Sequence, residues 1–74
     1  MISNEKFLQK LGKRIEELYL AKFDNQTEFA TACDVDTRTI RRIIKAEQNS
    51  TIIVLRRIAK ALEVDLSDLI DLED

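Results

Sequence analysis

The sequence predicts an all-α fold, and three observations lead to this prediction. The 74 residues contain no proline and one glycine, whereas the turns of short β-hairpins need such residues. Leucine, alanine, glutamate, lysine and arginine, which favour helices, are abundant. Apolar residues recur at helical spacing and are separated by residues that favour helix N-caps. We therefore expect a single domain over residues 1–74, built as a compact bundle of five helices.

The first helix is expected over residues 4–22. Its apolar residues recur with the period of an α-helix, while charged residues fill the other face. The apolar positions are Phe7, Leu8, Leu11, Ile15, Leu18 and Tyr19. This pattern stops at Phe23 and Asp24, so the helix should end just before them.

Two short helices are expected next, joined by a turn of three residues. Asn25 and Glu28 have the spacing of a capping box, which predicts a helix over residues 26–33. Asp34 tolerates the left-handed conformation that a tight turn needs, although less easily than glycine. Asp36 then serves as the N-cap of a helix over residues 37–46. The segment from about 26 to 46 is thus a helix-turn-helix unit.

Two further helices complete the predicted bundle. Ser50 or Thr51 is expected to cap a helix over residues 52–62, and Asp65 a helix over residues 66–72 with Asp68 in its first turn. The side chains that the first of these helices should bury are Ile52, Leu55, Ile58, Ala59 and Leu62.

The charges are unevenly distributed along the chain, although the net charge is only −2. Residues 37–60 contain seven basic residues and one acidic residue, a balance of +6. Residues 61–74 contain six acidic residues and no basic residue, and the first 36 residues have a balance of −2. A basic centre of this kind favours binding to a polyanion, which the net charge does not reveal.

The composition argues against an enzyme, a cofactor or a metal site. Histidine is absent and Cys33 is the only cysteine, so no nucleophile–base pair, metal-ligand set or internal disulfide is expected. No glycine-rich segment is available to hold a phosphate. There is neither a long apolar run nor a signal peptide, so we expect a cytoplasmic protein that does not enter a membrane.

Several segments in one register together resemble the Cro/C1-type (XRE) helix-turn-helix family. Those in the helix-turn-helix unit are Gln26 to Ala30, Cys33 to Val35 and Thr39 to Ile43, and those outside it are Leu11 to Leu18 and Leu55 to Leu62. The resemblance covers nearly the whole chain. It implies a fold of the lambda-repressor-like type and sequence-specific binding to double-stranded DNA. It also implies a transcriptional regulator of the repressor type.

The resemblance also implies which residues contact DNA. The residues expected to contact bases in the major groove are Thr37, Arg38, Arg41 and Arg42. Those expected to contact phosphates are Asn25, Gln26, Lys45 and Asn49. Helical periodicity agrees independently, because Ile40 and Ile43 should face inward and leave the arginines outside. A well-placed arginine–guanine pair contributes about 1–3 kcal/mol of discrimination between bases.

The chain departs from the family pattern at several positions. Asp34 replaces the turn glycine, Phe23 replaces the glycine after the first helix, and Ser50 replaces a proline. Ala46 replaces the glycine that ends the third helix, so this helix is expected to run longer. Ile44 and Ile53 stand where the family has polar residues.

These apolar substitutions raise the hypothesis of a homodimer on a palindromic operator, with half-sites about 34–36 Å apart. The candidate interface residues are Ile44, Ile53, Val54, Leu69, Ile70 and Leu72. An alternative is that an altered packing of the helices buries them. Arg56, Arg57 and Lys60 are interpreted as an ordinary solvated face. The alternative function is a protein-interaction module, such as an antitoxin-like domain that binds a partner.

Overall fold

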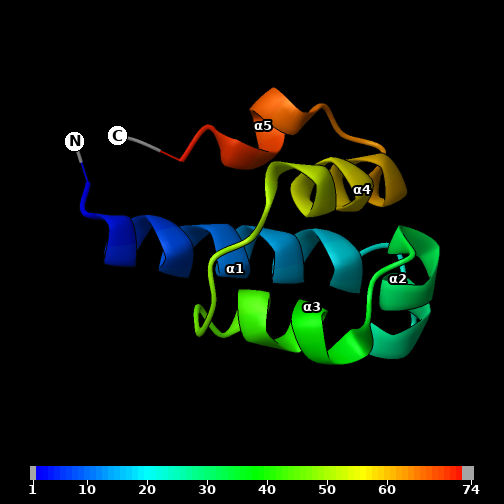
Figure 1. Ribbon diagram of the computed structural model, residues 1–74. Helices are drawn as coiled ribbons and strands as arrows, with labels where there is room; N and C mark the ends of the chain where they lie inside the picture. Colours follow the sequence, from blue (N-terminus) through cyan, green and yellow to red (C-terminus); the bar gives the residue numbers. More distant parts are fainter. Residues whose placement is uncertain (1, 73–74) are drawn as a thin grey trace.

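The computed structural model describes residues 2–72, and this part of the chain contains five α-helices and no strand (Figure 1). The helices are α1 (Asn4–Leu20), α2 (Gln26–Cys33), α3 (Thr37–Ile44), α4 (Ile52–Leu62) and α5 (Leu66–Ile70). The predicted all-α class and the order of the five helices are confirmed. The ends of three helices differ, because α1, α3 and α5 each stop two residues earlier than expected.

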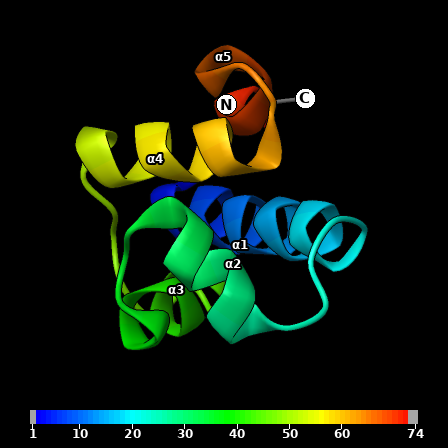
Figure 2. The same ribbon diagram turned by 90° about the vertical axis from the view of Figure 1, so that its right-hand side faces the viewer.

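Helix α1 crosses the middle of the molecule, with α2 and α3 on one side and α4 and α5 on the other (Figures 1 and 2). It packs against α3 and α5, while α2 packs against α3 and α4. Helix α4 also packs against α5. The helix-turn-helix unit is therefore supported from two directions, with α1 against α3 and α4 against α2.

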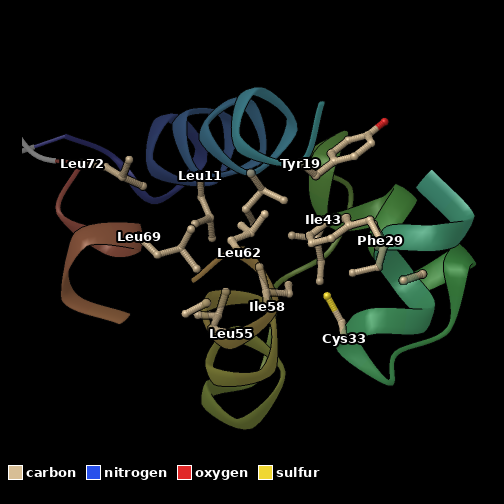
Figure 3. Packing of buried hydrophobic residues seen from close by; sticks show 14 residues of the cluster. Leu11, Tyr19, Phe29, Cys33, Ile43, Leu55, Ile58, Leu62, Leu69 and Leu72 are labelled. Atoms are coloured by element: carbon tan, nitrogen blue, oxygen red, sulfur yellow. The ribbon is translucent and has the colours of Figure 1, made fainter. Parts of the chain in front are cut away.

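The core lies where these helices meet, and its side chains point toward one another in Figure 3. The most deeply buried large side chains are Phe29, Leu11, Ile15, Ile40, Ile58 and Leu69. The rings of Tyr19 and Phe29 stack with centroids 5.0 Å apart, and Phe23 contacts Phe29 at 5.5 Å. The predicted burial of Ile52 is wrong, because this side chain is 59% exposed. It is the first residue of α4, directly after the N-cap Thr51, and the buried residues of this helix begin one turn later at Leu55.

Helices α1 to α4 begin at a residue whose side chain caps the helix. Asn25 accepts a hydrogen bond from the Glu28 N–H at 2.9 Å, and Thr51, rather than Ser50, accepts one from Val54 at 3.1 Å. Ser3 caps α1 through the Lys6 N–H. Asp65 occupies the N-cap position of α5, but its side chain makes no capping hydrogen bond, so that part of the prediction is wrong.

Three helices end at a residue in the left-handed conformation, and none of these residues is glycine. They are Asp34, Ala46 and Glu63, with φ angles of 57°, 58° and 58°. Each is followed by a reverse hydrogen bond to the helix, such as Glu47 N–H to the Arg42 carbonyl at 2.8 Å. The left-handed turn predicted at Asp34 is confirmed. The prediction of a longer third helix is wrong, because Ala46 adopts the left-handed conformation that a glycine would have adopted at this position.

Candidate nucleic-acid interface

The outer face of α3 bears a continuous basic stripe, which comprises Arg38, Arg41, Arg42 and Lys45. These residues are spaced by three, one and three positions, so their side chains share one face of the helix. All four are exposed, whereas Ile40, in the middle of the same helix, is buried in the core. Within residues 2–72 none of the four forms an ion pair, so the stripe presents positive charge that the described part of the chain does not neutralise.

The start of α3 is fixed by a cap and a turn. The Asp36 carboxylate accepts a hydrogen bond from the Arg38 N–H at 2.8 Å. This bond satisfies one of the N–H groups that lack a partner at the start of a helix. Thr37 is half-buried beside it in the first turn. The structure therefore places Thr37 at a defined helix end, beside Arg38, the first residue of the basic stripe.

The start of α2 offers a second set of polar groups. Asn25 is exposed and Gln26, the first residue of the helix, is half-buried. The Glu28 carboxylate accepts from the Asp24 N–H at 3.3 Å, one residue earlier than in a standard capping box. The backbone N–H groups at such a helix end, together with the helix dipole, favour an anion.

The end of α3 and the loop before α4 provide the remaining predicted contacts. Lys45 is the C-cap of α3, and both it and Asn49 are exposed. The Asn49 side-chain carbonyl accepts a hydrogen bond from the Ser50 N–H at 2.9 Å, which orients the amide. All eight predicted DNA contacts thus lie on α3, at the start of α2 or in the α3–α4 segment.

Sequence reasoning missed a residue that supports the turn of the helix-turn-helix unit. Arg57 of α4 donates a hydrogen bond to the carbonyl of Asp34 at 3.2 Å. Because its partner is 23 residues away in the sequence, no local pattern signals this contact. Arg57 is exposed, as are Arg56 and Lys60, so the predicted solvated face is confirmed, but Arg57 also has this structural contact.

Two of the predicted dimer-interface residues belong instead to the core of the chain itself. Leu69 is 0% exposed and Leu72 is 8% exposed. They are buried because α5 folds back against α1 and α4, and the Arg14 guanidinium holds it there through the Asp68 carbonyl at 2.6 Å. Ile53 is 52% exposed. Of the other candidates, Ile44, Val54 and Ile70 are half-buried.

Other kinds of site find little support in residues 2–72. No group of three potential metal ligands occurs there, and none of the described helices has the length and apolar character needed to cross a membrane. Cys33, the last residue of α2, is buried, and this burial raises the pKa of its thiol to about 11. The thiol is therefore protonated near neutral pH and suited to packing rather than to nucleophilic chemistry.

Comparison with known proteins agrees with the helix-turn-helix arrangement of the fold. A helix-turn-helix family model matches residues 24–69, and no curated protein sequence matches the chain. The fold is similar to the crystal structure of the restriction-modification controller protein C.AhdI from Aeromonas hydrophila. The TM-score is 0.80 with 26% identity, over 84% of this chain and 94% of that one. The chain therefore belongs to the Cro/C1-type (XRE) helix-turn-helix family and is a DNA-binding transcriptional regulator.

Proposed function

We propose that this regulator recognises a specific double-stranded DNA site by placing α3 in the major groove. The observation that carries the proposal is the basic stripe, which is exposed and unpaired within residues 2–72 on the face opposite Ile40 and Ile43. The major groove accommodates one α-helix, and its base edges distinguish all four base pairs. Thr37, Arg38, Arg41 and Arg42 are the residues that contact bases in this proposal.

The phosphate contacts are proposed on both sides of α3. Asn25 and Gln26 bring the start of α2 to one phosphate, where N–H groups and the helix dipole attract an anion. Lys45 and Asn49 contact the backbone beyond the other end of α3. Such contacts fix the orientation of α3 in the groove, while the arginines supply sequence preference.

We further propose that the protein binds as a homodimer to a palindromic operator. Ile53 supports this proposal, because a large apolar side chain that is 52% exposed next to half-buried Val54 suits a second chain. The chain measures 33 × 23 × 21 Å. Two such chains placed end to end along the 33 Å dimension would come close to the spacing of about 34–36 Å between half-sites one helical turn apart. The remaining interface candidates are Ile44 and Ile70.

The proposed regulation is repression from within the cytoplasm, by a dimer that covers its operator. The similarity to a restriction-modification controller protein supports a role for a small helix-turn-helix protein as a regulator. It favours DNA binding over the alternative of a protein-interaction module. No cofactor enters this proposal, so protein concentration and dimerisation would set the occupancy of the operator.

Selection of binding sites from a random pool of DNA duplexes tests the proposal. Wild type, the variant Arg38→Ala/Arg42→Ala and the control Arg56→Ala/Lys60→Ala are compared. The control removes the same number of positive charges from exposed positions on α4. We expect wild type and the control to enrich the same palindromic site. The α3 variant should enrich none, because its arginine–base pairs are gone.

Two results would contradict the proposal. If wild type enriches no sequence at low salt, base recognition by α3 is wrong. If the α3 variant enriches the same site as wild type, the base contacts lie elsewhere. A non-palindromic site bound by one chain would contradict only the homodimer.

A further inference from the structure

The sole glycine of the chain lies at the contact between α1 and α3. Gly12 is buried in the middle of α1. A Cβ atom built at this position would lie 2.8 Å from the Ile43 carbonyl oxygen and would overlap the Ile44 carbonyl oxygen. Both neighbours are backbone atoms of the last turn of α3, so neither can move aside as the end of a flexible side chain would.

This close approach determines how near α3 lies to α1. Leu11 and Ile15 flank Gly12 on α1 and are 2% and 0% exposed, so the surrounding contact is tightly packed. Glycine weakens the interior of a helix. Its presence here indicates that the close contact outweighs the lost helix propensity. Any larger residue would have to push the end of α3 outward.

The other end of α3 is held independently of Gly12. The Asp36 cap fixes the first turn, and the Arg57 hydrogen bond to Asp34 fixes the preceding turn. An outward push at Ile43 and Ile44 should therefore tilt α3 about its start. Arg41, Arg42 and Lys45 would move further than Arg38, because they lie nearer the displaced end.

We infer that Gly12 is a positioning residue for DNA recognition, which sets the angle at which α1 presents the basic stripe of α3. This inference rests on the proposed function, since it concerns the same stripe. It adds a residue that does not touch DNA and that lies outside the helix-turn-helix unit. Its expected signature is a loss of sequence preference that exceeds any loss of general DNA binding.

The test compares Gly12→Ala with the control Gln9→Ala, which introduces the same residue at an exposed, uncharged position of α1. Affinities for the selected site and for a scrambled duplex are measured at a temperature where circular dichroism shows both variants folded. We expect Gly12→Ala to weaken binding to the selected site by about tenfold or more. Binding to the scrambled duplex should stay within about threefold, because non-specific affinity depends on the number of positive charges, which the substitution does not change. The control should match wild type on both duplexes.

Base-by-base substitution of the selected site tests the tilt itself. Gly12→Ala should lose sequence preference mainly at the base pairs where Arg41→Ala or Arg42→Ala also loses it. The base pair that depends on Arg38 should be less affected. An equal loss at every base pair would overturn the tilt.

The outcomes that would overturn the role of Gly12 can be distinguished from the outcome that would overturn the proposed function. If wild type does not distinguish the two duplexes, the proposed function fails. If wild type distinguishes them and Gly12→Ala does so equally well, Gly12 has no positioning role. If Gly12→Ala is unfolded, the comparison is repeated with Ala46→Gly in both proteins, which relieves the left-handed strain at the end of α3. Unfolding in that background as well would assign Gly12 to stability alone.

Discussion

Residues in the left-handed conformation show how this chain manages with so little glycine. Asp34, Ala46 and Glu63 each adopt a φ angle near 58° at the end of a helix. A side chain in this conformation costs about 1–2 kcal/mol relative to the right-handed one. The only glycine, Gly12, is used where two backbones meet. The chain thus accepts strain at three helix ends and reserves glycine for a steric contact.

Replacing Ala46 by glycine should stabilise the protein by about 1 kcal/mol, because glycine adopts a positive φ angle without strain. In a domain of this size, that gain corresponds to a rise in melting temperature of about 4–8 °C. Thermal unfolding monitored by circular dichroism measures it. The control Ala32→Gly lies within α2 and should lower stability by about 0.5–1 kcal/mol. Equal effects of the two substitutions would contradict the strain at Ala46.

Burial of Cys33 should make the stability of the protein depend on alkaline pH. The folded state raises the pKa of this thiol from 9.0 to about 11, so folding favours the protonated form. The resulting stabilisation is complete below pH 9 and is lost as the pH rises through 11. Urea unfolding at pH 8 and pH 11 should show a larger loss for wild type than for Cys33→Ala. Identical losses in the two proteins would mean that the thiol ionises freely in the folded state.

At the scale of elements, the starts of the helices could be predicted from the sequence more accurately than their ends. A cap such as Asn25 or Asp36 bonds to a residue two or three positions away, so its partner is visible locally. The end of α3 at Ile44 depends instead on the turn conformation of Ala46 and on contact with α1. The support of the turn by Arg57 likewise depends on a partner in a distant part of the chain. Local spacing contains no information about either contact.

The cap of α3 provides a test at this scale. Asp36→Ala removes the acceptor for the Arg38 N–H and should destabilise the protein by about 1 kcal/mol. Asp36→Asn keeps a side-chain oxygen at the same place and should retain most of the stability. Urea unfolding of the two variants beside wild type measures the difference. If Asn is as destabilising as Ala, the negative charge rather than the hydrogen bond stabilises the start of α3.

For the whole molecule, the separation of basic and acidic segments indicates a surface suited to DNA, which the net charge of −2 does not reveal. The basic stripe on α3 could be predicted because helical periodicity and two buried isoleucines suffice to define its face. The residues of the proposed dimer surface could not be predicted as well. Leu69 and Leu72 are apolar and near the end of the chain, but only the folded structure shows that α5 turns them inward.

The proposed dimer surface can be tested through Ile53. Ile53→Asp places a charge at a side chain that is 52% exposed, so it should disrupt a dimer without unfolding the chain. The control Leu20→Asp alters another apolar side chain that is 61% exposed, at the end of α1. Sedimentation equilibrium should show a dimer for wild type and the control, and a monomer for Ile53→Asp. A monomeric wild type well above micromolar concentration would contradict the homodimer.

The most direct test of the central claim, that α3 supplies base contacts while its flanks supply phosphate contacts, is a salt titration of binding. Wild type, Arg38→Ala/Arg42→Ala and Lys45→Ala are titrated with the selected site and with a scrambled duplex. Lys45→Ala should weaken binding to both duplexes by a similar factor and reduce the slope of log K against log salt by about 1. The double arginine variant should lose most of the preference for the selected site. If both variants reduce the two affinities in the same proportion, α3 contributes only charge, and the account of base recognition is wrong.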